Sequence, residues 1–145
     1  MPIKSFRGLI ANETTETISL HTNTGSTGYR IRKFELIGYE PGGQQTENVV
    51  KIFTIPQTGT PTSKIDFSDN TLLGAAVHTN QASANSPYNS VVIFDNMTFN
   101  QDIYITHADE GGTAPVNYYI ELEQVKLDLN ENTVATLKDI RNISA

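Results

Sequence analysis

Apolar and polar residues alternate with a period of two in short segments along most of this chain. In 15–21, for example, Ile18 and Leu20 fall on one side of an extended strand while Ser19 falls on the other. Turn-forming residues such as Asn, Gly, Pro and Thr separate these segments. The pattern predicts about eight or nine strands, which we place at residues 6–11, 15–21, 29–39, 48–55, 72–77, 91–94, 98–99, 103–107 and 117–129.

Two predicted strands contain a change of phase. Ile31 lies out of phase with the apolar residues that follow it in 29–39, which predicts a β-bulge or a partly exposed start. In the last strand, the apolar residues of 120–122 and those of 125–129 keep opposite phases. Because a slip of one residue reverses the buried face, we predict a second bulge near Glu123–Gln124.

Only the C-terminal segment has a helical pattern. Asn130 can cap a helix, and Val134, Leu137 and Ile140 recur every third residue after it. We therefore expect one short helix over 130–143.

Together these elements predict an all-β fold, an antiparallel β-sandwich of jelly-roll-like or other Greek-key topology, with the short C-terminal helix. We expect one domain over residues 1–145, because no linker or internal repeat interrupts the chain and its length suffices for a core. Residues 1–12 are expected to form either an N-terminal arm or the first strand of the sandwich.

Composition and charge narrow the classes of function. The chain has no cysteine, which excludes disulfides, zinc–thiolate sites and thiol catalysis. Its 10 Lys and Arg against 16 Asp and Glu give a net charge of −6, and an acidic domain repels phosphate backbones. No segment has the run of about 18 apolar residues that spans a bilayer. We therefore expect neither nucleic-acid nor membrane binding.

Two clusters contain residue types that serve catalysis or metal binding. His107, Asp109 and Glu110 lie in one short segment, but residues so close in a loop rarely converge on one ion. Glu121 and Glu123 share one strand face at about 6.6–7 Å, a spacing that a solvated face also produces. No nucleophile, phosphate-loop or zinc-protease motif occurs. We predict a non-enzymatic protein with no catalytic residue, metal ligand or cofactor.

The last third of the chain resembles a known group of proteins. The runs that carry the resemblance are VIFDNMTFNQDIYITH at 92–107, NYYIELE at 117–123 and LDLNENTVATLKDIR at 127–141. They are similar to small virion structural proteins of tailed bacteriophages, especially those that infect cyanobacteria and other marine bacteria. The resemblance spans about residues 90–143.

This resemblance implies a capsid decoration, or cement, protein that is made in the bacterial cytoplasm and binds the outer surface of the shell of major capsid protein. It also implies a homo-oligomer, with a trimer as the expected state. An acidic surface suits the exterior of a capsid, since a protein that faces the packaged genome would be basic. The residues expected to contact the partner are Ile3, Phe6 and Leu9 near the N-terminus and the basic residues Arg30, Arg32 and Lys33.

Two other functions stay open on the sequence. A carbohydrate-binding or receptor-binding module of a phage tail would use aromatic platforms, for which the candidates are Tyr88, Tyr104, Tyr118 and Tyr119, although the chain has no Trp. A hydrolase on a jelly-roll scaffold would need several histidines at set spacing, whereas the three histidines here are scattered.

Overall fold

The computed structural model describes residues 3–20, 27–40, 46–80, 88–94 and 98–127. Every regular element among them is a β-strand, which confirms the predicted all-β class. The strands are β1 (Ile3–Ile10), β2 (Thr14–Ile18), β3 (Thr27–Gly38), β4 (Thr46–Phe53), β5 (Leu72–Asn80), β6 (Tyr88–Ile93), β7 (Ile103–Asp109) and β8 (Val116–Lys126). The predicted helix over 130–143 lies outside the described residues. Among those that are described, no helix has the length and apolarity needed to cross a membrane.

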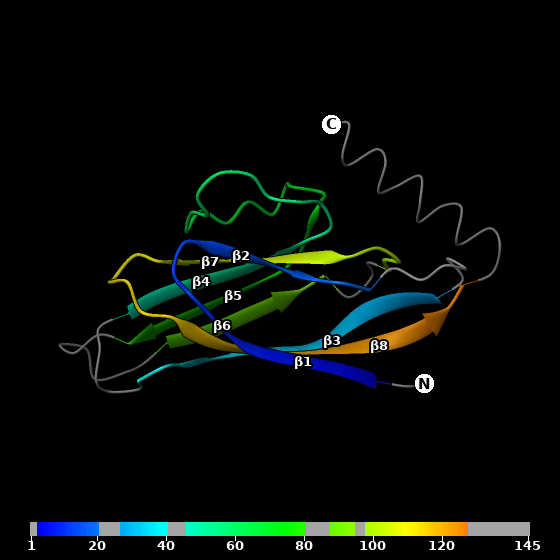
Figure 1. The fold of residues 1–145 in the computed structure, drawn as a ribbon, viewed down its shortest axis with the longest axis horizontal. Coiled ribbons are helices and arrows are strands. Elements are labelled where there is room, and N and C mark those ends of the chain that lie inside the picture. Colours follow the sequence, from blue (N-terminus) through cyan, green and yellow to red (C-terminus); the bar gives the residue numbers. More distant parts are fainter. Residues whose placement is uncertain (1–2, 21–26, 41–45, 81–87, 95–97, 128–145) are drawn as a thin grey trace.

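The strands form two antiparallel sheets, with strand orders β1-β8-β3 and β2-β7-β4-β5-β6. Figure 1 shows them as two stacked layers. The chain passes from one sheet to the other after β1, β2, β3 and β7, so strands far apart in sequence are paired, such as β1 with β8 and β2 with β7. This arrangement is compatible with the predicted β-sandwich.

The core lies between the two sheets, where the apolar faces of their strands meet. Its fully buried side chains come from both layers and include Val50, Ile52, Ile103, Ile105, Ile120 and Leu122. Each such side chain stabilises the fold by about 1.5–3 kcal/mol through its removal from water. Alternation alone therefore identified much of the core correctly.

A single extra residue keeps the apolar positions of β3 on the core side. The register of β3 on β8 shifts between Ile31 and Lys33, so Arg32 is the extra residue of a β-bulge. Because of this residue, Ile31 before the bulge and Phe34 after it are both buried in the core. The irregularity predicted at Ile31 is thus confirmed as a bulge.

The second predicted bulge, near Glu123–Gln124, is wrong. β8 has no extra residue here: its register with β1 is regular up to Glu123, and in its pairing with β3 the extra residue lies on β3. The change of phase in the sequence has another cause: Leu127, just after the end of β8, is buried although it keeps the phase of the outward-facing residues of that strand. Leu127 is only 5% exposed and lies against Gly28, where an added Cβ would approach the leucine side chain to 3.1 Å.

The segment 54–71 covers the outward-facing side of the five-stranded sheet (Figure 1). Lys51 of β4 is buried on this side, and its Nζ donates a hydrogen bond to the carbonyl oxygen of Lys64 at 2.7 Å. Burial lowers the pKa of Lys51, while the charge of Asp69 acts in the opposite direction. Most of 56–63 is exposed, as the absence of apolar residues in this stretch predicts.

Candidate functional site

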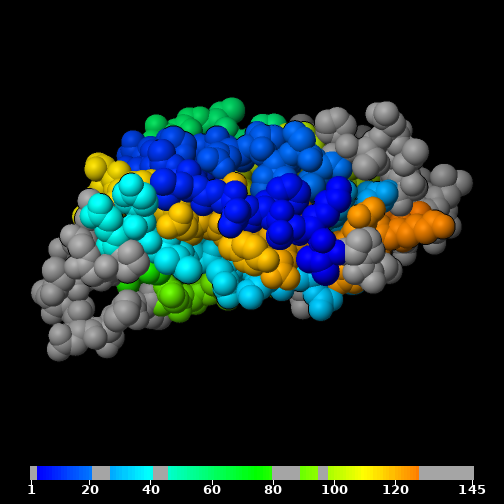
Figure 2. Space-filling view, turned by 60° about the horizontal axis from the view of Figure 1, so that its bottom comes forward, coloured from blue at the N-terminus to red at the C-terminus, as the bar shows by residue number. Residues whose placement is uncertain are grey.

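The candidate site is the outward-facing side of the β1-β8-β3 sheet, which we call the outer face. Its residues alternate with those that face the core and lie in four cross-strand rows. In order along the sheet, the rows are Ile3–Glu123–Arg30, Ser5–Glu121–Lys33, Arg7–Tyr119–Glu35 and Leu9–Asn117–Ile37. The bulge residue Arg32 reaches Glu123 and so joins the first row. Figure 2 shows the three strands side by side on one face of the molecule.

Five of the six residues predicted to contact a partner lie on the outer face, namely Ile3, Leu9, Arg30, Arg32 and Lys33. The sixth, Phe6, lies on the opposite side of β1 and packs against the core. Residues 3–10 are a strand of the sheet, one of the two alternatives that the sequence left open. The structure thus gathers the apolar and basic candidates, which are far apart in sequence, on one surface.

Glu123 holds the two arginines of the outer face in place. Arg30 Nη2 lies 3.2 Å from Glu123 Oε1, and Arg32 Nη1 binds Glu123 Oε2. The carboxylate is only 9% exposed, whereas the arginine side chains are 40% and 59% exposed. These charge-assisted hydrogen bonds, first from Arg32 and then from Arg30, lower the pKa of Glu123 against the opposing effect of desolvation.

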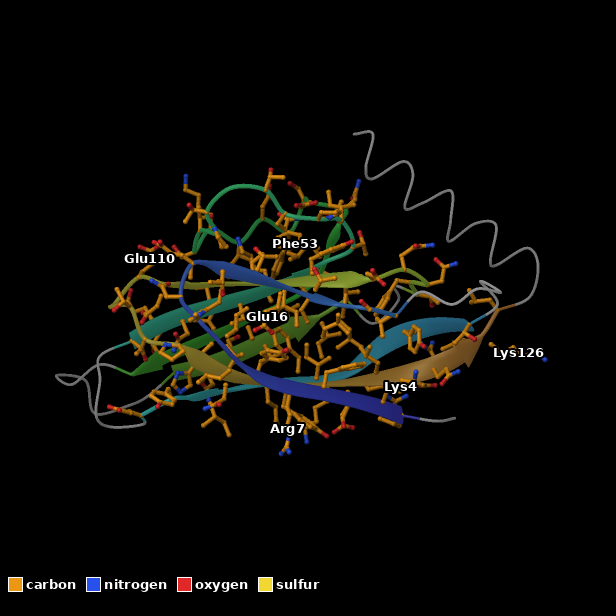
Figure 3. All side chains as sticks on the ribbon, viewed as in Figure 1. Lys4, Arg7, Glu16, Phe53, Glu110 and Lys126 are labelled. Atoms are coloured by element: carbon orange, nitrogen blue, oxygen red, sulfur yellow. The ribbon has the colours of Figure 1, made fainter. Side chains whose placement is uncertain are left out.

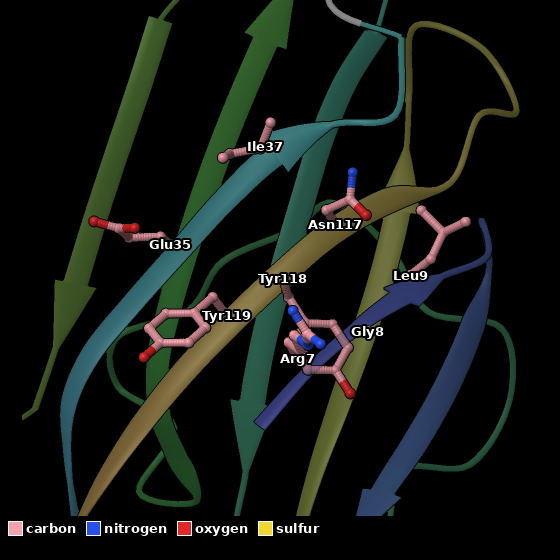
Figure 4. Close-up of a pocket in the computed structure, with 8 residues that line it drawn as sticks. All are labelled: Arg7, Gly8, Leu9, Glu35, Ile37, Asn117, Tyr118 and Tyr119. Carbon is pink, nitrogen blue, oxygen red and sulfur yellow. The ribbon is translucent and has the colours of Figure 1, made fainter. Parts of the chain in front are cut away.

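A groove of about 410 Å³ lies over the two rows at the other end of the outer face. Figure 4 shows its lining, which consists of Arg7, Gly8, Leu9, Glu35, Ile37, Asn117, Tyr118 and Tyr119. Leu9 and Ile37 are 45% and 60% exposed, so apolar surface lies beside charged groups at this end of the outer face. Arg and Tyr side chains are enriched at the energetic centres of protein interfaces.

Arg7 has no carboxylate partner among the described residues. Its side chain points away from the other sheet (Figure 3). The other charged groups near the groove are engaged, since Lys33 pairs with Glu35 at 3.6 Å and Tyr119 donates to Glu121 at 2.9 Å. An arginine guanidinium in such a position can bind a carboxylate with two parallel hydrogen bonds.

The outer face has a charge balance unlike that of the whole chain. It contains four basic side chains, those of Arg7, Arg30, Arg32 and Lys33, against three acidic ones, those of Glu35, Glu121 and Glu123. The whole chain has a net charge of −6. The outer face is thus slightly basic on an acidic protein, and it suits a partner surface that is apolar with acidic groups.

The residues of both clusters considered for chemistry are engaged in other contacts. Glu121 accepts a hydrogen bond from Tyr119, and Glu123 pairs with Arg30 and Arg32. His107 and Asp109 are buried, whereas Glu110 is exposed. The carboxylate of Asp109 accepts hydrogen bonds from the backbone N–H groups of Glu47, Gly111 and Ala114. In the described ranges, no group of three or more His, Asp or Glu side chains could hold a metal ion.

Sequence reasoning missed the residues that line the centre of the groove, which are Arg7, Glu35, Ile37 and Asn117. Arg7 shares the phase of Ile3 and Leu9 on β1, so the period of two could have identified it. Ile37 and Asn117 could not be joined to Leu9 from sequence, because their proximity depends on the register of β3 and β1 on β8.

No protein-family model matches the chain, and a search of curated proteins finds no match.

Proposed function

We propose that this protein is a non-enzymatic virion structural protein that decorates the outside of a tailed-phage capsid and stabilises the shell of major capsid protein. The outer face is the surface that we assign to this contact. The observation that carries the assignment is the concentration of exposed Leu9 and Ile37 around Arg7, which has no carboxylate partner in the described part of the chain, on the slightly basic side of an acidic molecule. The assignment to a phage virion rests on the resemblance of residues 90–143.

Docking would act by linkage. A protein that binds the expanded shell, but not the disassembled capsid subunits, stabilises the shell. The stabilisation free energy grows with the ratio of the decoration protein's free concentration to its Kd for the shell. A preformed sheet suits this role because few of its residues need to be ordered on binding. We propose a jelly-roll-like topology. This proposal is supported by the strand neighbours in the two sheets, which are β1-β8-β3 in one and β2-β7-β4-β5 in the other.

The direct test is co-sedimentation of the purified protein with expanded, undecorated capsids. We expect saturable binding of the natural protein and at least a tenfold weaker apparent affinity for Arg7→Glu and Ile37→Glu. Ile65→Glu is the matched control, since Ile65 is also an exposed aliphatic residue but lies in the segment outside the outer face. Natural protein that does not bind, or variants that bind as well as the control, would contradict the proposal.

Oligomeric state is tested in the same preparation by light scattering. We propose a trimer on the capsid, which corresponds to a ring closed by identical head-to-tail contacts. At saturation we expect one trimer of this protein to be bound at each cluster of capsid subunits. A single monomer at each binding position would contradict the proposed trimer.

A second candidate function is carbohydrate or receptor binding by a tail module. The observation that favours it is Tyr119 in the groove, with polar Arg7, Glu35 and Asn117 around it. An aromatic side chain among such groups can stack on a sugar while the polar groups bind its hydroxyls. Binding to a glycan array that is lost in Tyr119→Ala, together with no binding to capsids, would favour this function over decoration.

A further inference from the structure

The edge strand β1 forms one side of the groove on the outer face but buries little of its own surface. Arg7 and Leu9 of β1 line the groove together with residues of β3 and β8. Of the eight residues of β1, only Ile10 is buried, while Phe6 and Gly8 are partly buried. Among the described strands, β1 pairs with β8 alone. Since burial of apolar surface is the dominant stabilising contribution in folding, the position of β1 depends on the few contacts that its inner side makes.

One of these contacts comes from Tyr118 of β8, whose side chain spans the space between the two sheets. Tyr118 is only 7% exposed, and its hydroxyl donates a hydrogen bond of 2.9 Å to Glu16 Oε2. Glu16 lies on β2, an outer strand of the five-stranded sheet, whereas β8 is the central strand of the other sheet. Burial raises the pKa of Tyr118 above its usual 10, and the hydrogen bond and charge of Glu16 act in the same direction. The hydroxyl group therefore stays protonated and remains a donor at neutral pH.

The ring of Tyr118 lies against β1 at Gly8. The two residues are directly opposite each other in the β1–β8 ladder, and Figure 4 shows the ring beside Gly8. A Cβ on Gly8 would lie 3.0 Å from the Tyr118 hydroxyl oxygen, 3.1 Å from Cε1 and 3.2 Å from Cζ. Carbon atoms in favourable contact lie about 3.5–4.0 Å apart, so the ring occupies the space of a side chain at position 8. Gly8 has no positive φ, so this close approach, and not its backbone conformation, accounts for the glycine.

We infer that Tyr118 is a positioning residue of the outer face, which braces the edge strand β1 from its inner side. The ring is fixed at its far end by Glu16 and packs across Gly8. This contact holds β1 in the position in which Arg7 and Leu9 line the groove. A larger residue at position 8 must either displace the ring or move β1 outward. The importance of this brace for partner binding rests on the proposed function, whereas the brace itself does not.

Hydrogen exchange of the full-length protein, followed residue by residue by NMR, tests the brace without any partner. Strands with few buried contacts open locally, and each opening allows their amide hydrogens to exchange. Tyr118→Phe keeps the ring and removes only the hydroxyl. Because a hydrogen bond to a charged group is among the stronger ones, we expect the amides of β1 that bond to β8 to exchange at least about tenfold faster in this variant.

β6 is the matched control within the same molecule. It is also the outer strand of a sheet, and it lies at the opposite end of its sheet from β2. Its amides should exchange within about twofold of their natural rates in Tyr118→Phe. Equal acceleration in β1 and β6 would show that the hydroxyl contributes only to global stability, and unchanged rates in β1 would show that it contributes nothing there. Either result would overturn the brace.

Gly8→Val tests the packing of the ring across β1, with opposite expectations in two backgrounds. Val suits a strand better than Gly does, but in the natural protein its methyl groups would meet the Tyr118 ring. The unfolding equilibrium constant should therefore rise at least about tenfold. In Tyr118→Ala the ring is gone, so the same substitution fills vacated space and should lower the unfolding constant.

Denaturant unfolding of the four proteins measures both effects of Gly8→Val. The same sign in the two backgrounds would overturn the packing of Tyr118 across Gly8. If Tyr118→Ala does not fold, the exchange rates of Tyr118→Phe alone decide.

Co-sedimentation with expanded capsids tests whether the brace serves the outer face. The side chain added in Gly8→Val lies on the core side of β1, so it adds nothing to the outer face itself. We nevertheless expect at least about tenfold weaker binding, because Arg7 and Leu9 move with β1. Val50→Ala is the control, since it removes buried methyl groups from β4 in the other sheet and should bind within about twofold of the natural protein.

The two proposals fail in different ways. Natural binding by folded Gly8→Val would overturn the positioning role of Tyr118 and leave the capsid contact standing. Natural protein that does not bind capsids would contradict the proposed function, while the exchange rates in β1 and β6 would still decide the brace.

Discussion

At the scale of single residues, Glu123 shows how a largely buried charge organises an exposed surface. It lies in the central strand of the three-stranded sheet, between Ile3 of β1 and Arg30 of β3. Its two arginine partners keep their aliphatic stems on the outer face while their guanidinium groups remain partly exposed. The carboxylate of Glu123 thus fixes the positions of both guanidinium groups on the outer face.

The charge of Glu123 predicts a specific response to acid. Because Arg32 and Arg30 lower the pKa of Glu123 in the folded state below its usual 4.5, its contribution is present above about pH 4.5 and is lost as the pH falls through the lowered value. Glu123→Gln should therefore flatten the acid limb of a plot of unfolding free energy against pH. Glu35→Gln is the control, since its pairing with Lys33 is exposed and should contribute little. Equal acid limbs in the natural protein and Glu123→Gln would contradict the argument.

At the scale of elements, β3 depends on one inserted residue. Its two ends have apolar residues in different phases, and only the extra residue Arg32 lets Tyr29 and Phe34 both face the core. The start of β3 also pairs with a segment other than β8, because Tyr29 and Phe99 exchange backbone hydrogen bonds of 2.7 and 3.0 Å. Their rings stack with centroids 6.3 Å apart. The correct phase at this end therefore secures contacts with a distant segment.

Deletion of Arg32 should be far more damaging than its substitution. Without the extra residue, either Tyr29 and Ile31 or the following half of β3 must turn away from the core. Loss of two buried side chains should lower the unfolding free energy by at least about 3 kcal/mol, or prevent folding. Arg32→Ala keeps the residue count and should cost less than about 1 kcal/mol. Denaturant unfolding of both variants measures the difference, and similar losses would show that the bulge has no role in register.

At the scale of the whole molecule, the two sheets share one core rather than stabilising themselves separately. The core residues come from both sheets, and the chain passes between them four times. A three-stranded sheet with one face on such a core cannot lose its partner without exposing that face. The outer face and the end of the sandwich that contains His107 are therefore supported by the same packing.

Cooperative unfolding of both sheets is the resulting expectation. Ile120→Ala on β8 should lower the unfolding free energy by about 2–5 kcal/mol, because Ile120 is fully buried. Ile3→Ala on the adjacent strand should change it by no more than about 0.5 kcal/mol, because Ile3 is half exposed. Circular dichroism and tyrosine fluorescence should give coincident transitions in both variants. Separate transitions would mean that the sheets unfold independently.

The sequence by itself determined the all-β class, the approximate positions of the strands in the described residues and an irregularity at Ile31, because these depend on local alternation and turn residues. Tertiary structure alone decided that Leu9, Ile37 and Asn117 line one groove and that Gly8 lies against Tyr118, since strand pairing joins residues about a hundred positions apart. It also decided against the bulge at Glu123–Gln124. Alternation in one strand records which side is buried, but not what buries it.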